Sequence, residues 1–224
     1  MNTRWPRSLS CVLAAAVSAA FLIGCGQDKH GRSCPHRTGK DLSARTVAGS
    51  ELWQKTLRCV DLERAELTGL VSEANLSRGN LYAARLSGAS LENVDLRNAD
   101  LRRAKLTSAT LSEVDLRGAD LSGAELGKAL LTNVSLGGAH LAGADLRAAS
   151  LSHVDFTTAD LRDADLAGAA LSESDLRGAR MRGADVSRTS WENVVCPDGS
   201  RSDARMSCTN HLALGGPHPG QPGS

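Results

Sequence analysis

The sequence predicts an all-β fold, a quadrilateral β-helix in which the chain winds as a coil with four short sides. Three observations predict it. From Leu76 to Leu151 every fifth residue is leucine, and apolar residues keep this phase as far as Trp191. The residue two places before each of them is small, usually alanine. At nearly every fourth of these small positions valine replaces alanine, which adds a period of twenty residues.

A short fixed period indicates a solenoid. An amphipathic helix would repeat near 3.6 residues and a strand at two, and a period of five fits neither. It fits a backbone that turns a corner after every five residues. The period of twenty then means that four sides complete one coil, so that each side stacks on itself. The valines that carry this period, with Ser174 as the single exception, are Val94, Val114, Val134, Val154 and Val194.

Each five-residue repeat therefore has two inward residues. The five-spaced apolar residue, called here the core position, should meet its counterpart in the next coil about 4.8 Å away. The residue two places earlier, called here the small position, must be small because the coil is narrow. Each buried leucine should contribute roughly 1.5–3 kcal/mol of transfer free energy. Aromatic residues make up 3% of the chain, as expected for a core without room for rings.

The N-terminus reads as an export signal. Arg4 and Arg7 precede an apolar stretch from Leu9 to Ile23, which is shorter than the ~20 apolar residues of a membrane span. Leu22-Ile23-Gly24-Cys25 resembles the bacterial lipobox. The resemblance implies a lipoprotein signal peptide over 1–24, lipidation of Cys25, and anchoring in the cell envelope at the outer membrane or cell surface. The alternative is cleavage near Ser18-Ala19-Ala20, which would release a soluble protein.

Polar residues 25–41 read as a flexible tether, followed by the β-helix over 42–195. From Leu42 to Leu67 the core position also recurs every five residues, but the step from Leu67 to Val71 is four. Residues 42–70 are therefore expected to form an irregular first coil with one shortened corner near Gly69. The alternative is a looser cap, because three small positions there are held by larger or polar residues, Arg45, Ser50 and Lys55.

The cysteines indicate how the C-terminal end of the β-helix is closed. Cys11 falls in the export signal and Cys25 in the lipobox, which leaves Cys34, Cys59, Cys196 and Cys208. An even number in an exported protein suggests disulfides, and three pairings are open. Cys34–Cys59 and Cys196–Cys208 are favoured because each closes a short loop. We expect a disulfide-closed cap over 196–210 and a disordered Gly- and Pro-rich tail over 211–224.

The repeats have the form alanine, aspartate or asparagine, leucine and two further residues, as in Ala99-Asp100-Leu101. They resemble the pentapeptide-repeat family, which implies a right-handed coil. The family includes quinolone-resistance proteins that bind DNA gyrase by imitating DNA, so DNA mimicry is the alternative function. A DNA mimic should be strongly negative. From Ser72 to Trp191 there are 16 acidic and 14 basic residues, and the whole chain carries +1, so no nucleic-acid partner is indicated.

The sequence predicts no enzyme, cofactor or metal site. The repeat brings together no catalytic set of histidine, serine or cysteine. The carboxylates are stacked in straight columns, whereas a calcium ion needs several oxygens that converge on one point. The predicted function is that of a protein-interaction or structural scaffold. One nearly uncharged column is the candidate docking face for an unknown envelope protein or for a second copy of the chain: Ser90, Thr110, Leu130, Ser150, Ala170 and Ser190.

Overall fold

A computed structural model describes residues 26–27, 33–34, 40–202 and 208. The chain divides into two units, Met1–Arg37 and Thr38–Ser224. In the first, β1 (Gly26–Gln27) pairs with β2 (Ser33–Cys34) in antiparallel fashion. The predicted signal peptide, Cys25, most of the tether and the tail over 211–224 lie outside the described residues. No helix within the described ranges is long and apolar enough to cross a membrane.

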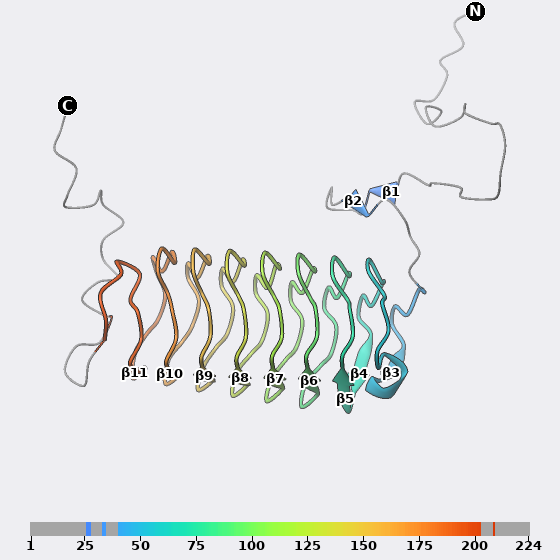
Figure 1. The fold of residues 1–224 in the computed structure, drawn as a ribbon, viewed down its shortest axis with the longest axis horizontal. Coiled ribbons are helices and arrows are strands. Elements are labelled where there is room, and N and C mark those ends of the chain that lie inside the picture. Colours follow the sequence, from blue (N-terminus) through green and yellow to red (C-terminus); the bar gives the residue numbers. More distant parts are fainter. Residues whose placement is uncertain (1–25, 28–32, 35–39, 203–207, 209–224) are drawn as a thin grey trace, which may run out of the picture. The chain divides into compact units, whose positions relative to one another are not determined.

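The second unit contains the predicted all-β quadrilateral β-helix, which is confirmed (Figure 1). Seven parallel strands stack one per coil in the order of the sequence. Every partner is twenty residues away, as between Leu91 and Leu111. The strands are β5 (Leu70–Ser72), β6 (Ser90–Glu92), β7 (Thr110–Ser112), β8 (Leu130–Thr132), β9 (Ser150–Ser152), β10 (Ala170–Ser172) and β11 (Ser190–Glu192).

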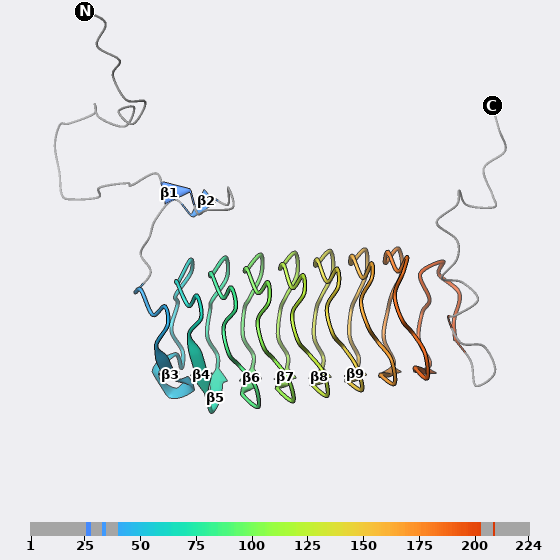
Figure 2. The ribbon, with the colours of Figure 1, turned by 180° about the vertical axis from the view of Figure 1, so that it is seen from behind.

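Within residues 40–202, one of the four sides forms a continuous sheet. The other sides are joined by isolated parallel bridges, such as Asp95 with Asp115, Asp100 with Asp120 and Lys105 with Glu125. From Asn75 to Val195 these bridges keep the spacing of twenty residues, and the coils lie in register along the stack (Figure 2). Equivalent residues of successive coils therefore form columns. We call the outward surface of β5–β11 the sheet face. It is the side on which the sequence places the candidate docking column.

The core is the stack of core and small positions. Leu101, Leu121 and Leu141 are fully buried, as are Ala99 and Ala119 between them. Phe156 is the one aromatic residue among the largest fully buried side chains. The narrow interior explains why alanine alternates with leucine, since a larger residue at a small position would meet the opposite side of the coil.

The corners require a left-handed backbone whether or not glycine is available. The residue two places after each core position has positive φ throughout the regular coils, with 65° at Gly118 and 56° at Glu113. The sequence indicates this only where glycine occurs. A non-glycine residue in this region costs roughly 1–2 kcal/mol. The conformation lets the corner N–H pair with the next coil, as when Glu113 N–H donates to Thr132 O at 3.0 Å.

The first coil joins the stack through one short turn. β3 (Thr46–Ala48) pairs with β4 (Glu66–Thr68) at a spacing of twenty residues, but Thr56 bridges Asn75 and Asp61 bridges Asn80 at nineteen. The missing residue is the four-residue step between Leu67 and Val71, where Gly69 has a φ of 74°. Residues 42–70 therefore continue the stack with one corner shortened.

A short 3₁₀ helix, η1 (Gly49–Glu51), lies against the first strand of the sheet. Gly49 is buried, and a Cβ atom added to it would lie 2.0 Å from the carbonyl oxygen of Leu70. Only a residue without a side chain allows this approach. The edge of β5 is thus bordered by η1, where an unprotected edge strand would be free to pair with another chain.

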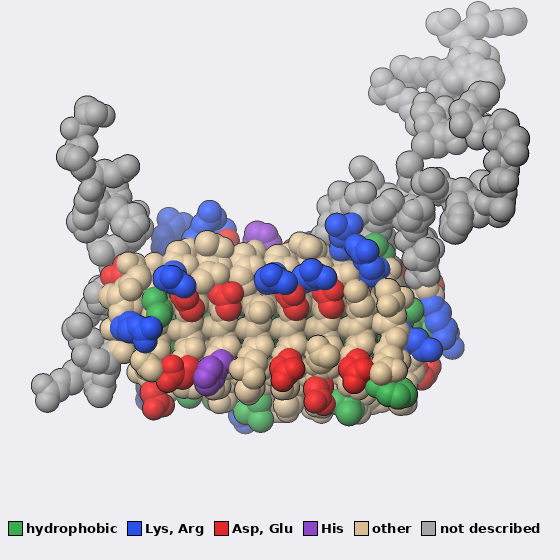
Figure 3. All heavy atoms as spheres, in the orientation of Figure 1, with side chains coloured by type: hydrophobic (Ala, Val, Ile, Leu, Met, Phe, Trp, Pro, Cys, Tyr) green, Lys and Arg blue, Asp and Glu red, His purple; other side chains and the backbone are tan. Residues whose placement is uncertain are grey.

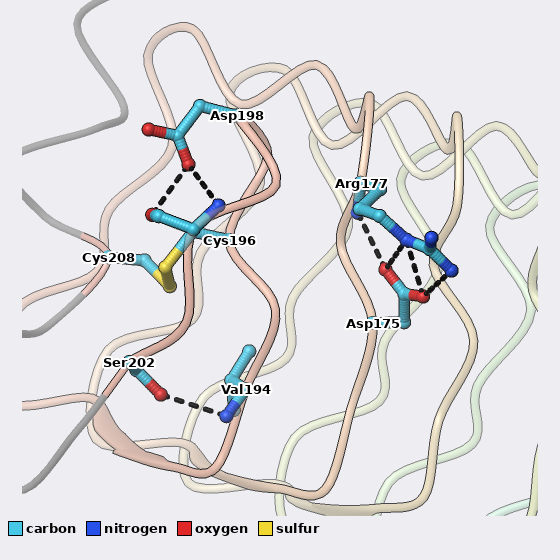
Figure 4. The surroundings of a disulfide bond; sticks show 8 residues. Asp175, Arg177, Val194, Cys196, Asp198, Ser202 and Cys208 are labelled. Atoms are coloured by element: carbon cyan, nitrogen blue, oxygen red, sulfur yellow. Dashed lines mark hydrogen bonds and ion pairs between the residues drawn. A yellow bond between two sulfur atoms is a disulfide. The ribbon is translucent and has the colours of Figure 1, made fainter.

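The C-terminal end folds back on itself. Val195 bridges Arg201 in antiparallel fashion, and the turn between them is closed by hydrogen bonds from Cys196 N–H to Ser200 O and from Gly199 N–H to Cys196 O. Cys196 and Cys208 form the expected disulfide, beside a hydrogen bond from Val194 N–H to Ser202 Oγ (Figure 4). The last coil is thereby covered by its own continuation.

The second predicted disulfide involves Cys59. Cys59 is disulfide-bonded, but the side chain of Cys34 lies outside the described part, so the Cys34–Cys59 pairing stays a prediction.

Trp191 occupies the last core position on the sheet side and is 8% exposed. Its indole N–H is buried and has no hydrogen-bond partner among the described residues. The large ring fills the end of the core, where no further leucine follows.

Candidate docking face

Within residues 40–202 and 208 no cluster of His, Cys, Asp and Glu is arranged to hold a metal ion. His140 stands in a column between Asp120 and Asp160, whereas His153 lies at a corner with its ring nitrogen 3.0 Å from Ser152 Oγ. A shallow hollow of about 390 Å³ crosses the corner over Ala74 and Val94. Neither feature brings together a nucleophile, a base and an oxyanion donor, the arrangement that hydrolytic catalysis would need.

The predicted docking residues all lie on the sheet face. They are the first residues of β6–β11, and each pairs through its backbone with the next. Five of the six are exposed, and Ser90 is half-buried. A second outward column on the same strands completes the surface with Glu92, Ser112, Thr132, Ser152, Ser172 and Glu192.

The centre of the sheet face carries no charge. From Thr110 to Ser172 both outward columns hold only serine, threonine, leucine and alanine. Neutral side chains on a rigid sheet are cheap to desolvate compared with ionised groups. This stretch is therefore the part of the coil whose surface could be covered at the smallest electrostatic cost.

The exposed large hydrophobic side chains of the described residues gather on the same face. They are Trp53, Leu70 and Leu130, with exposed fractions of 54%, 49% and 50%. Leu130 stands in the middle of the sheet and Leu70 on β5. Trp53 heads the second column, because the following residue, Gln54, donates its N–H to Ser72 O. Exposed apolar side chains on a flat surface are typical of a contact site.

Leu70 and Trp53 were not part of the face predicted from the sequence. A strict spacing of twenty leads from Ser90 to Leu70. The missing residue between Leu67 and Val71 hides only the alignment of Trp53, because the same spacing leads from Ser72 to Leu52. Taking the four-residue step into account places Trp53 nineteen residues before Ser72. The sequence contains this spacing, but it places Trp53 on the sheet face only when the pairing between the first two coils is known.

The other sides of the coil carry columns of charged residues, and rows of acidic and basic side chains are visible on the face shown in Figure 3. Arg97 binds Asp95 through two nitrogens, Nε to Oδ1 at 2.9 Å and Nη2 to Oδ2 at 2.7 Å. The same Arg97 reaches the next coil, with Nε 3.6 Å from Asp115 Oδ2. This pairing within one Asp-Leu-Arg repeat recurs at Asp100–Arg102, Asp115–Arg117, Asp145–Arg147, Asp160–Arg162 and Asp175–Arg177.

These pairs lower the pKa of five of the aspartates. The side-chain hydrogen bond from the arginine is the largest cause at Asp95, Asp145 and Asp160, each with a pKa below its ordinary 3.8. At Asp115 and Asp175 burial alone would raise the pKa, and the hydrogen bonds from the arginine outweigh it. Each ion pair between exposed groups contributes little to the stability of the fold, but the repeat places several such pairs along the coil.

The pairs predict an acid limit to stability. Because the pKa in the folded chain lies below the ordinary 3.8, the paired aspartates stabilise the fold above that pH. The contribution is lost as the pH falls through the lowered pKa values. We expect the midpoint of urea unfolding to be nearly constant from neutral pH to about pH 5 and to fall below about pH 4. A midpoint that stays unchanged at pH 2.5 would contradict this account.

Comparison with known families supports the sequence pattern. The family model described as pentapeptide repeats, eight copies, matches residues 84–123, 124–163 and 159–190. No curated protein matches the chain significantly.

Several solved structures are also similar to the chain. HetL, a pentapeptide-repeat protein involved in heterocyst differentiation regulation in the cyanobacterium Nostoc sp. strain PCC 7120, is 28% identical, with 72% of this chain and 94% of HetL covered at a TM-score of 0.30. The fluoroquinolone resistance protein QnrB1 is 16% identical, with 65% and 90% covered at 0.27. A pentapeptide-repeat protein from the Arabidopsis thaliana thylakoid lumen is 25% identical, with 50% and 72% covered at 0.28.

The repeat pattern, the stacked four-sided coils and the family match agree over the same residues. The chain belongs to the pentapeptide-repeat family.

Proposed function

We propose that this protein is a non-catalytic interaction scaffold, held in the bacterial envelope by a lipid on Cys25, and that the sheet face docks an envelope protein. The observation that carries the proposal is the contrast between the sides of the coil. Three sides carry columns of charged residues, many of them in ion pairs, whereas the sheet face is neutral at its centre and exposes Leu130.

The geometry of the sheet favours binding of a preformed surface. Each strand is hydrogen-bonded on both sides within the stack, from β6 to β10. The outward side chains are consequently held at fixed spacings, and little conformational entropy is lost when a partner covers them. The hydroxyl groups of Thr110, Ser150 and Ser152 can donate and accept hydrogen bonds at the rim of a contact around Leu130.

DNA mimicry is the weaker alternative. Phosphates of DNA are imitated by carboxylates that are free to attract a basic protein groove. Here Asp95, Asp115, Asp145, Asp160 and Asp175 each share their charge with the arginine two residues on. A basic protein groove would therefore meet an arginine beside each of these five aspartates.

Crosslinking in the native envelope tests the proposal. The mature protein is captured after crosslinking, and co-purified proteins are identified by mass spectrometry. We expect one envelope protein to be enriched with the unaltered chain and lost with Leu130→Lys together with Ser150→Arg. The matched control adds the same charges at a corner away from the sheet face, with Asn98→Lys and Thr158→Arg, and should retain the partner.

Two outcomes would count against the docking face. A partner that is captured equally by the Leu130→Lys, Ser150→Arg variant binds elsewhere on the coil. Recovery of gyrase subunits would favour the DNA-mimic alternative and reject the envelope location.

A further inference from the structure

Charge is separated along the chain, although the total is close to zero. Residues 26–58 contain seven Lys and Arg but three Asp and Glu, for a net charge of +4. Residues 59–202 contain sixteen Lys and Arg and 21 Asp and Glu, for a net charge of −5. The part nearest to Cys25 is therefore positive, and the rest of the coil is negative.

Cationic side chains on the first coil occupy unusual positions. Arg45 and Lys55 hold small positions, which from Val60 to Ala179 are filled by buried residues except at Gly69. Both are exposed. Among the described residues, no earlier coil is stacked against this one. The end of the core is therefore open, and the charged groups of Arg45 and Lys55 can reach solvent there. Lys40 and Arg58 are exposed on the same coil.

An exposed aromatic ring accompanies these cations. Trp53 lies between Arg45 and Lys55 in the sequence of the first coil and is 54% exposed. The neighbouring apolar side chain on the sheet face, Leu70, is 49% exposed. Tryptophan, with an apolar body and a polar N–H, is favoured at membrane interfaces, where lysine and arginine reach the headgroups.

The chain also limits how far this coil can be from a lipidated Cys25. Fifteen residues separate Cys25 from Lys40, so a fully extended connection spans at most about 50 Å. A basic patch adds electrostatic attraction to the membrane binding that acyl chains provide. Each Lys or Arg near an anionic surface adds to the attraction.

We propose that the first coil is a membrane-contact site for anionic phospholipid headgroups, bound by Arg45 and Lys55 with Lys40 and Arg58, and by insertion of Trp53 at the interface. This inference rests on the proposed lipid anchoring. The negative remainder of the coil is repelled by the same surface. The two effects together would orient the coil with its first turn toward the lipid and its later turns away from it.

Vesicle binding without the acyl chains tests the site. The probe is a vesicle of one part phosphatidylglycerol to three parts phosphatidylcholine, compared with phosphatidylcholine alone. The protein is the mature chain from residue 25 with Cys25→Ser. The mature chain holds two tryptophans, and Trp191 is buried, so a change in emission reports on Trp53. We expect binding to the anionic vesicles only, with a blue shift of Trp53 and weakening by salt.

Matched charge reversals locate the contact. Arg45→Glu with Lys55→Glu should weaken binding to anionic vesicles at least tenfold. Arg103→Glu with Lys128→Glu changes the net charge equally at exposed positions on later coils and should weaken it much less. Equal losses in the two double variants, or equal binding to both kinds of vesicle, would overturn the proposal.

The test is separable from that of the docking face. An envelope protein captured through the sheet face, together with absence of vesicle binding, would reject the membrane contact alone. Vesicle binding lost with Arg45→Glu and Lys55→Glu, but no captured protein, would support the membrane contact and reject the docking role. Far-ultraviolet circular dichroism of each variant verifies that the coil remains folded.

Discussion

Leu111→Asp is expected to prevent folding of the central coils. Leu111 is fully buried and lies between Leu91 and Leu131 of the adjacent coils. A carboxylate there would be surrounded by apolar side chains, and it could become neutral only by taking up a proton at a cost in free energy. Together with the lost leucine, the destabilisation should exceed ~4 kcal/mol, a size that few single substitutions reach. Urea unfolding followed by circular dichroism measures it.

The neighbouring residue provides the control. Thr110 belongs to the same strand, β7, but its side chain points outward and is exposed. Thr110→Asp adds the same charge one residue away and should change the unfolding free energy by less than about 1 kcal/mol. If both variants unfolded alike, β-propensity rather than burial would govern this strand.

Gly49→Ala should have the second largest effect, confined to one end of the molecule. The added methyl carbon would lie 2.0 Å from Leu70 O and 2.3 Å from Leu70 C. Both atoms are backbone, so no side chain can rotate away. Relieving the overlap requires η1 to separate from β5, at ~3 kcal/mol or more. Since coils contact only their neighbours, the later coils should remain folded. Hydrogen exchange should increase mainly between residues 42 and 57.

Gly143→Ala separates this steric effect from the loss of a glycine. Gly143 has a φ of +65° and open space around the added carbon. The alanine variant should therefore lose only the left-handed preference, about 1 kcal/mol. Were Gly49→Ala no worse than Gly143→Ala, the contact between η1 and β5 would not be important for the first coil.

The regular part of the fold follows from the sequence because each inward position is specified repeatedly. The columns of Asp95 with Asp115 and of Ser90 with Thr110 follow from the period of twenty alone, and the structure confirms their register. The six residues of the candidate docking column lie in one column for the same reason, and their docking role stays a prediction. A repeated pattern averages over local exceptions such as Ser174, whose buried hydroxyl accepts a hydrogen bond from Val154 N–H at 3.0 Å.

Features that occur once could not be predicted in this way. The contact of Gly49 with Leu70 depends on a three-residue helix that has no counterpart in the other coils. Positive φ at Glu113 or His153 is imposed by the stack and contradicts the local preference of these residues. The bidentate pairing of Asp95 with Arg97 depends on side-chain conformations, which a column of charges does not determine.

The constant spacing of twenty residues makes the height of the coil adjustable in equal steps. Because each coil pairs with the one below and the one above through the same backbone groups, a segment such as 111–130 could be duplicated without creating a new kind of contact. Every duplication would add one coil and about 4.8 Å of height. Evolution can therefore set the distance between the two ends of the coil by changing the number of repeats.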